Sequence, residues 1–68
     1  MDQEIFNLSV RKFLKMVGVR SQHEIEQAVE KAISSGAIKG GEKLAATMTL
    51  KIAAMRLDVT FEGQIDLQ

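Results

Sequence analysis

The 68-residue chain has no cysteine, no tryptophan and no tyrosine, and its nine basic residues are balanced by nine acidic ones. Without cysteine, neither a disulfide framework nor a thiolate metal site can form. With zero net charge, the chain has no overall electrostatic attraction to nucleic acid or to anionic membranes. No apolar run reaches the length of about 18 residues that a transmembrane helix needs. Since small domains usually rely on a disulfide, a metal or a partner chain, these absences favour self-association.

The length allows one small domain, which we expect to span residues 1–68. A chain of this size buries only about 60% of its unfolded surface and is marginal as a monomer. Its first residues, MDQEIFNLSV, begin acidic and continue amphipathic, unlike a secretory signal. We therefore expect a soluble protein of the cytoplasm.

Residues 1–36 are predicted to form two helices that pack as a helical hairpin. The first runs from an N-cap at Asp2 to Val17, with Gly18 in the left-handed position past its end. Ser21 and Glu24 form the capping box that starts the second helix, and Gly36 ends it. Apolar residues recur at helical spacing in both segments: Phe6, Val10, Phe13 and Val17, then Ile25, Ala28, Val29, Ala32 and Ile33.

Residues 44–67 are predicted to form a two-stranded antiparallel β-hairpin. Apolar and polar residues alternate from Thr47 to Ile52 and again from Leu57 to Leu67, which is typical of half-buried strands. The second alternation passes Gly63 without losing phase, so we expect one long strand with a bend or bulge there. Ala53–Arg56 is predicted to be the turn between the strands, and AIKGGEKLAA a loop before them.

The predicted fold is therefore α+β, a helical hairpin followed by a β-hairpin. A two-stranded sheet with one apolar face is marginal and leaves two open edges. A two-fold homodimer would complete it by joining two hairpins into a four-stranded sheet. Exchange of the C-terminal strand between the two subunits is a variant of the same hypothesis.

The stretch from Phe13 to Val29 has the outline of a helix-turn-helix, but its individual positions argue against DNA reading. Leu14 is bulky where that motif needs a small residue. Glu24 and Gln27 fall where the second helix should be apolar. The exposed face of that helix carries three acids and one base, whereas a recognition helix meets phosphates and needs the reverse. A plain helical hairpin is the preferred interpretation.

A basic cluster is the strongest candidate for a binding surface: Arg11, Lys12, Lys15 and Arg20. Leu8 falls on the same polar side of the first helix, and an exposed leucine beside cations suits a contact with another protein. Solvated helix faces also carry such runs of charge. Without an aromatic platform, four cations are a weak signal for nucleic acid.

Catalytic and metal sites find no support. His23 is the single histidine and is expected at the surface, while zinc needs three or four ligands. Asp58, Glu62 and Asp66 share one strand face at steps of roughly 13 Å, too wide for paired catalytic carboxylates or one calcium ion. The Gly-Gly-Glu-Lys stretch lacks the spacing of a phosphate loop. We expect no enzyme activity, no cofactor and no metal.

Several segments together, FNLSVRKFLKMVGV, SQHEIEQAV, GAIKGGEKL, MTLKI and GQIDL, resemble a family of short bacterial proteins of unknown function. The resemblance covers nearly the whole chain. It implies a bacterial, soluble α+β protein that is dimeric, and it supplies no catalytic residue.

The sequence thus predicts a homodimeric, non-enzymatic interaction or adaptor module that contacts an unknown protein partner. The alternative is a weak nucleic-acid-associated regulator that uses the basic side of the first helix. A small enzyme is a third possibility, although 68 residues can hardly enclose a pocket without a dimer interface.

Overall fold

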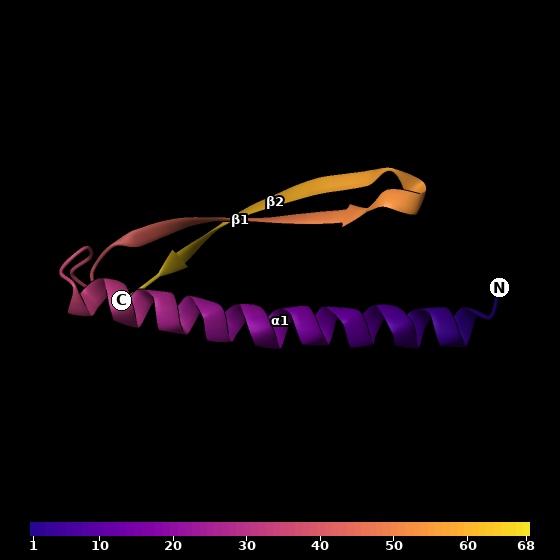
Figure 1. The fold of residues 1–68 in the computed structure, drawn as a ribbon, viewed down its shortest axis with the longest axis horizontal. Helices are drawn as coiled ribbons and strands as arrows, with labels where there is room; N and C mark the ends of the chain where they lie inside the picture. Colours follow the sequence, from indigo (N-terminus) through magenta and orange to yellow (C-terminus); the bar gives the residue numbers. More distant parts are fainter. The chain divides into compact units, whose positions relative to one another are not determined.

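The computed structural model describes residues 1–68 and contains one long helix followed by a hairpin of two strands (Figure 1). Helix α1 spans Gln3–Ser34, β1 spans Lys43–Ile52, and β2 spans Leu57–Asp66, with the short 3₁₀ turn η1 at Ala53–Met55. Two compact units result, Met1–Ala37 and Ile38–Gln68. The predicted α+β class and the antiparallel hairpin are confirmed.

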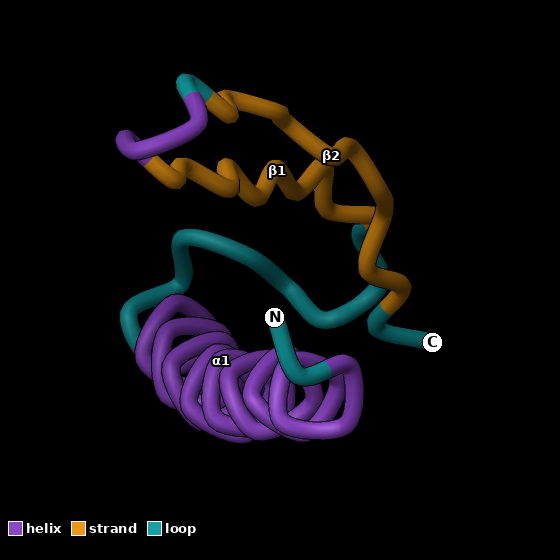
Figure 2. The backbone as a smooth tube through the Cα atoms, turned by 90° about the vertical axis from the view of Figure 1, so that its right-hand side faces the viewer, coloured by secondary structure: helices purple, strands orange, loops and turns teal.

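The predicted helical hairpin is wrong, because α1 continues without a break through Gly18 (Figure 2). Gly18 is not among the residues with positive φ. Glycine inside a helix costs about 1 kcal/mol relative to alanine, which a single position can bear. Val17, Ser21 and Ile25 follow one another at steps of four, so the face of the helix keeps its phase across this point. Ser21 therefore lies inside the helix and starts no second one.

The two ends of α1 follow the predicted caps. One carboxylate oxygen of Asp2 accepts hydrogen bonds from the backbone N–H of Glu4 at 3.0 Å and of Ile5 at 3.1 Å. At the other end Gly36 has φ of 80°. The Gly36 N–H donates to the carbonyl of Ile33 and the Ala37 N–H to that of Ala32, at 3.1 and 2.9 Å, which is the Schellman arrangement.

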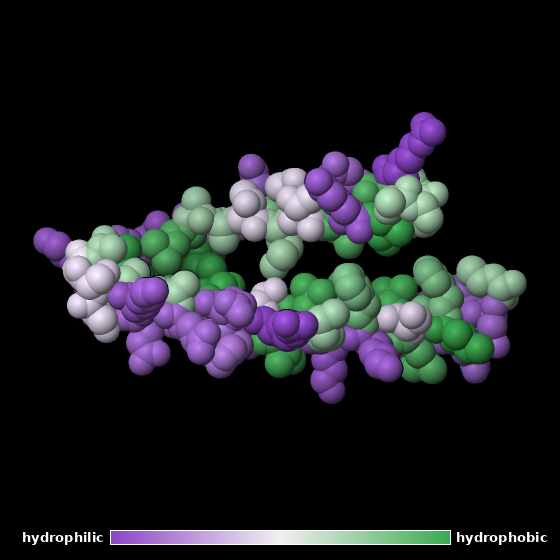
Figure 3. All heavy atoms as spheres, in the orientation of Figure 1, coloured by the Kyte–Doolittle hydropathy of each residue, from purple (hydrophilic) through white to green (hydrophobic).

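One side of α1 carries a continuous row of apolar and small residues, which we call the helix stripe. The side chains follow one another at steps of three or four and so share one face of the helix. Figure 3 shows apolar residues gathered along α1 beside strongly polar ones. The helix stripe consists of Phe6, Val10, Phe13, Val17, Ser21, Ile25, Ala28 and Ala32.

The hairpin pairs ten residues of β1 with ten of β2, from Lys43 opposite Asp66 to Ile52 opposite Leu57. Strand β1 begins at Lys43, one residue before the predicted start of the hairpin and four before the predicted alternation, and β2 supplies a partner for each of these residues. Gly63 lies directly opposite Ala46, and no residue is left unpaired. Of the bend or bulge predicted at Gly63, the bulge is therefore excluded, while the single long strand is confirmed.

The register gives the hairpin one apolar and one polar face. On the polar face, cross-strand neighbours match in chemistry: Lys43 lies opposite Asp66 and Lys51 opposite Asp58, and the hydroxyls of Thr49 and Thr60 are hydrogen bonded at 3.1 Å. Such pairs stabilise a sheet by about 0.2–1 kcal/mol each. The apolar face consists of Leu44, Ala46, Met48, Leu50 and Ile52 with Leu57, Val59, Phe61, Gly63 and Ile65.

The predicted turn at Ala53–Arg56 is confirmed, and it carries local strain. Arg56 has φ of 54° in the left-handed region, and its N–H donates to the carbonyl of Ala53 at 3.1 Å. Left-handed backbone costs a residue with a side chain roughly 1–2 kcal/mol.

No side chain of the single chain is buried, so neither unit encloses a hydrophobic core. The apolar face of α1 and that of the hairpin therefore each stay uncovered within their own unit.

Candidate functional site

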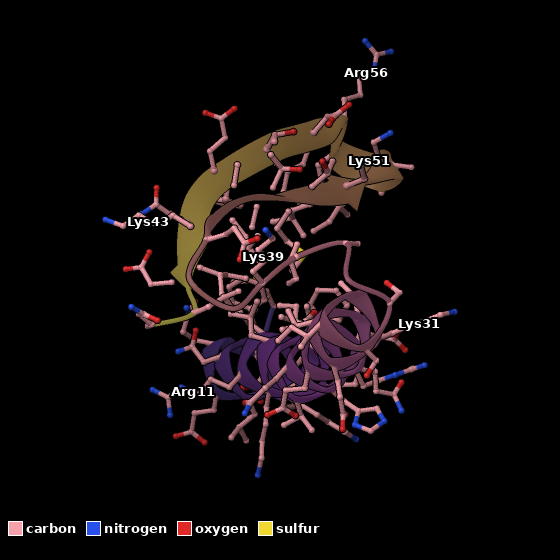
Figure 4. The ribbon with its side chains drawn as sticks, turned by 90° about the vertical axis from the view of Figure 1, so that its left-hand side faces the viewer. Arg11, Lys31, Lys39, Lys43, Lys51 and Arg56 are labelled. Carbon is pink, nitrogen blue, oxygen red and sulfur yellow. The ribbon has the colours of Figure 1, made fainter.

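The continuous helix brings four of the five predicted contact residues onto one face of α1. Leu8, Arg11, Lys12 and Lys15 stand at positions i, i+3, i+4 and i+7, which lie above one another on a helix. We call these four residues the basic face. Leu8 is 65% exposed. Figure 4 shows the Arg11 side chain pointing away from α1.

Arg20, the fifth predicted residue, does not belong to the basic face. A residue one turn beyond Lys15 on that face stands at position 19, so Arg20 projects from another side of the helix. The position is taken by Val19, which is 62% exposed. The sequence analysis does not place Val19 on this face, because it predicts that the first helix ends at Val17.

Beyond Val19 the same face of α1 turns acidic. Glu26 and Glu30 follow at steps of seven and four, and Gln22 donates a hydrogen bond from Nε2 to Glu26 Oε2 at 3.3 Å. The cations of the basic face thus lie at least three helical turns from these carboxylates. Treating residues 3–34 as one periodic helix would have shown this separation from the sequence.

Two shallow hollows on α1 are each lined by residues of the helix alone. One is lined by Glu4, Asn7, Leu8 and Arg11, which occupy two successive turns. A surface of this kind cannot enclose a small substrate, since ligand pockets bury most of the ligand. It suits the side chain of another protein, with Leu8 as the apolar contact and Arg11 as the charged one.

The loop before β1 holds one carboxylate tightly. Glu42 accepts hydrogen bonds from the backbone N–H groups of Lys39, Gly40 and Gly41, with the shortest at 2.8 Å. These bonds favour the charged form, so the Lys39 and Gly40 amides lower the pKa of Glu42 below its ordinary value. Gly40 has φ of 106°, a backbone conformation that glycine adopts readily and that this arrangement of N–H groups around the carboxylate requires. The loop is a turn, as predicted, and its amides serve the chain's own carboxylate.

Two further features bear on the class of site. No group of three or more histidine, aspartate or glutamate side chains gathers where it could hold a metal ion. No helix of the structure combines the length and the apolar character needed to span a bilayer.

The comparisons with known proteins match the chain to a family and to no individual protein. Neither a curated protein nor a solved structure matches the chain. A family of unknown function, DUF6494, matches residues 1–68, which agrees with the resemblance found in the sequence. The chain therefore belongs to the DUF6494 family.

Proposed function

We propose that this protein is a non-enzymatic interaction module that works as a homodimer in the bacterial cytoplasm. The observation that carries the proposal is that α1 and the hairpin each carry a full apolar face while no side chain is buried. A two-stranded sheet and a single helix are marginal alone. Burial of these faces against a second copy would supply the missing core.

The basic face is proposed as the surface for a second protein. Leu8 beside three cations suits an acidic partner that offers an apolar side chain. The helix stripe remains available for self-association, because the two surfaces lie on opposite sides of α1. One protein could thus hold its own copy and a partner at the same time, which is the property of an adaptor.

Self-association is tested by the molar mass in solution. Sedimentation equilibrium at micromolar concentration is expected to give twice the chain mass of 7.5 kDa. A mass of one chain over the whole range would remove the homodimer and the proposal with it. Strand exchange is not needed for this dimer, since β1 and β2 pair within one chain along ten residues.

Partner binding is tested with two lysine variants that carry the same change in charge. K15E places an acid on the basic face, whereas K31E alters a different side of the same helix. After gentle purification at low salt, the wild type and K31E are expected to carry one protein in a fixed ratio, and K15E to lose it. Equal loss in both variants would contradict a role for the basic face.

A nucleic-acid-associated regulator remains the alternative, with Arg11, Lys12, Lys15 and Arg20 as its contacts. The acidic half of α1 disfavours it, since Glu26 and Glu30 continue the same face. Nucleic acid that copurifies and leaves steeply as salt rises would support this alternative. A thermal-shift screen with metabolites and metals tests for an enzyme, because a bound ligand raises the melting temperature.

A further inference from the structure

The helix stripe has the same spacing when counted from either end. Its steps are four, three, four, four, four, three and four, so the row is symmetric about position 19. Positions 6 and 32, 10 and 28, 13 and 25, and 17 and 21 each sum to 38. Two copies of α1 laid antiparallel with Val19 at the centre therefore match the helix stripe along its whole length of about 39 Å.

The side chains of the helix stripe differ in size between the two halves of α1. The bulky residues stand in the first half, where Phe6 and Phe13 lie, and small residues stand in the second, where Ala28 and Ala32 lie. An antiparallel pair places Phe6 level with the partner's Ala32 and Val10 level with the partner's Ala28. Three of the four layers then combine a larger with a smaller side chain, and the fourth sets Phe13 level with the partner's Ile25, so the bulk is spread more evenly than in a parallel pair.

A parallel pair would pack poorly. Phe6 would meet the partner's Phe6 at one end, and Ala32 would meet the partner's Ala32 at the other. The helix axes would have to lie far apart at the first layer and close together at the last. Straight rods such as α1 can satisfy both demands only by diverging, which would open one end of the interface.

Gly18 supplies an independent observation at the centre of symmetry. A Cβ added to Gly18 would meet nothing within 4 Å in the single chain, so the chain's own packing gives no reason for glycine. Gly18 lies between Leu14 and Ser21 at helical steps of four and three, along the edge of the helix stripe. Small residues at this point allow the backbones of two crossing helices to come close.

We infer that α1 pairs with α1 of a second copy in an antiparallel arrangement centred on Val19, through the helix stripe. The inference rests on the proposed homodimer and specifies its interface. The eight positions of the helix stripe are repeated twice in the dimer.

Cysteine cross-linking tests the arrangement, and the chain contains no cysteine of its own. Chains carrying V10C and chains carrying A28C are mixed, allowed to exchange and oxidised. Since a disulfide needs Cβ atoms about 3.8 Å apart, the mixed V10C–A28C product is expected in at least about tenfold excess over either symmetric product. In the antiparallel pair two copies of position 10 stand about 27 Å apart along the axis.

The possible outcomes distinguish a failure of the antiparallel interface from a failure of the proposed homodimer. Predominant symmetric V10C–V10C products would show a parallel pair and overturn the inference, as would a dimer that forms none of the three disulfides. Both results leave the homodimer standing. A single-chain mass would instead remove the homodimer itself. Circular dichroism of each reduced variant checks that α1 is intact.

Discussion

Helix α1 and the hairpin distribute their charges in opposite ways. The hairpin matches charge within itself, because its register sets Lys43 opposite Asp66 and Lys51 opposite Asp58. Helix α1 instead holds Arg11, Lys12 and Lys15 at least three turns from Glu26 and Glu30. The polar face of the hairpin is complementary to itself, whereas the basic face of α1 stays separate from the acids that continue it and suits an acidic partner. Changes in α1 should therefore act on association, and changes in the hairpin on folding.

The largest effect is expected from aspartate in the helix stripe. V17D would bury a charge without a partner near the centre of the helix pair, and the dissociation constant should rise at least about 100-fold. V19D makes the same change two residues away on the exposed side, where Val19 is 62% accessible. It should leave association within about threefold of the wild type. Sedimentation equilibrium measures both, and equal loss of the dimer in both variants would contradict the assignment of faces.

Replacing Gly18 by alanine should stabilise an isolated helix but weaken a pair of helices that approach closely at this residue. For an isolated helix G18A should be stabilising by about 1 kcal/mol, because alanine has the higher helix propensity. If two helices approach closely at Gly18, the added methyl group should raise the dissociation constant about tenfold. Asn7→Ala, at an exposed position away from the centre, serves as the control. A tighter dimer in G18A would show that no backbone comes close there.

A change in the hairpin turn should alter folding and leave association alone. Arg56→Gly removes the cost of a side chain at φ of 54° and should raise the free energy of unfolding by about 1 kcal/mol. Met55→Gly is the matched control, because Met55 does not have positive φ and gains no such relief. Urea unfolding at fixed protein concentration reports the difference. An unchanged midpoint for Arg56→Gly would show that the turn is not strained.

The smallest effect concerns the loop held by Glu42. Because backbone N–H groups stabilise its carboxylate, the folded pKa lies below the ordinary 4.5. Charged Glu42 thus adds stability above that value, and this contribution is lost as pH falls through the lowered pKa. The amide resonances of Lys39, Gly40 and Gly41 should titrate together with a midpoint under 4.5 and lose this step in E42Q. A midpoint above 4.5 would show that the hydrogen bonds do not form in solution.

Local sequence signals explain how much of the fold could be predicted from the sequence. Alternation in β1 and β2 is a local signal, and the caps at Asp2 and Gly36 are local too, so these features were found. Gly18 and the Ser21–Glu24 pair are also local signals, yet α1 continues through both, because one glycine costs a helix only about 1 kcal/mol and the helical spacing keeps its phase there. Of the bend or bulge expected at Gly63, the bulge does not form, because a glycine can pair in regular register opposite Ala46.

The candidate surface was predicted in part for the same reason. Leu8, Arg11, Lys12 and Lys15 lie within one continuous stretch of helix, where spacing alone defines a face. Arg20 was misplaced and Val19 missed because both lie past the expected end of the first helix. The symmetry of the helix stripe about Val19 cannot be seen at all while the helix is divided into two.

The central claim is that two copies of α1 pair antiparallel about Val19, and one distance tests it most directly. A nitroxide label at Asn7→Cys leaves the helix stripe untouched, and pulsed electron resonance of the dimer measures the separation of the two labels. Antiparallel pairing centred on Val19 sets the two positions about 36 Å apart along the axis. A distance distribution centred near that value is the predicted result, and a distribution under about 20 Å, as in a parallel pair, would contradict the account.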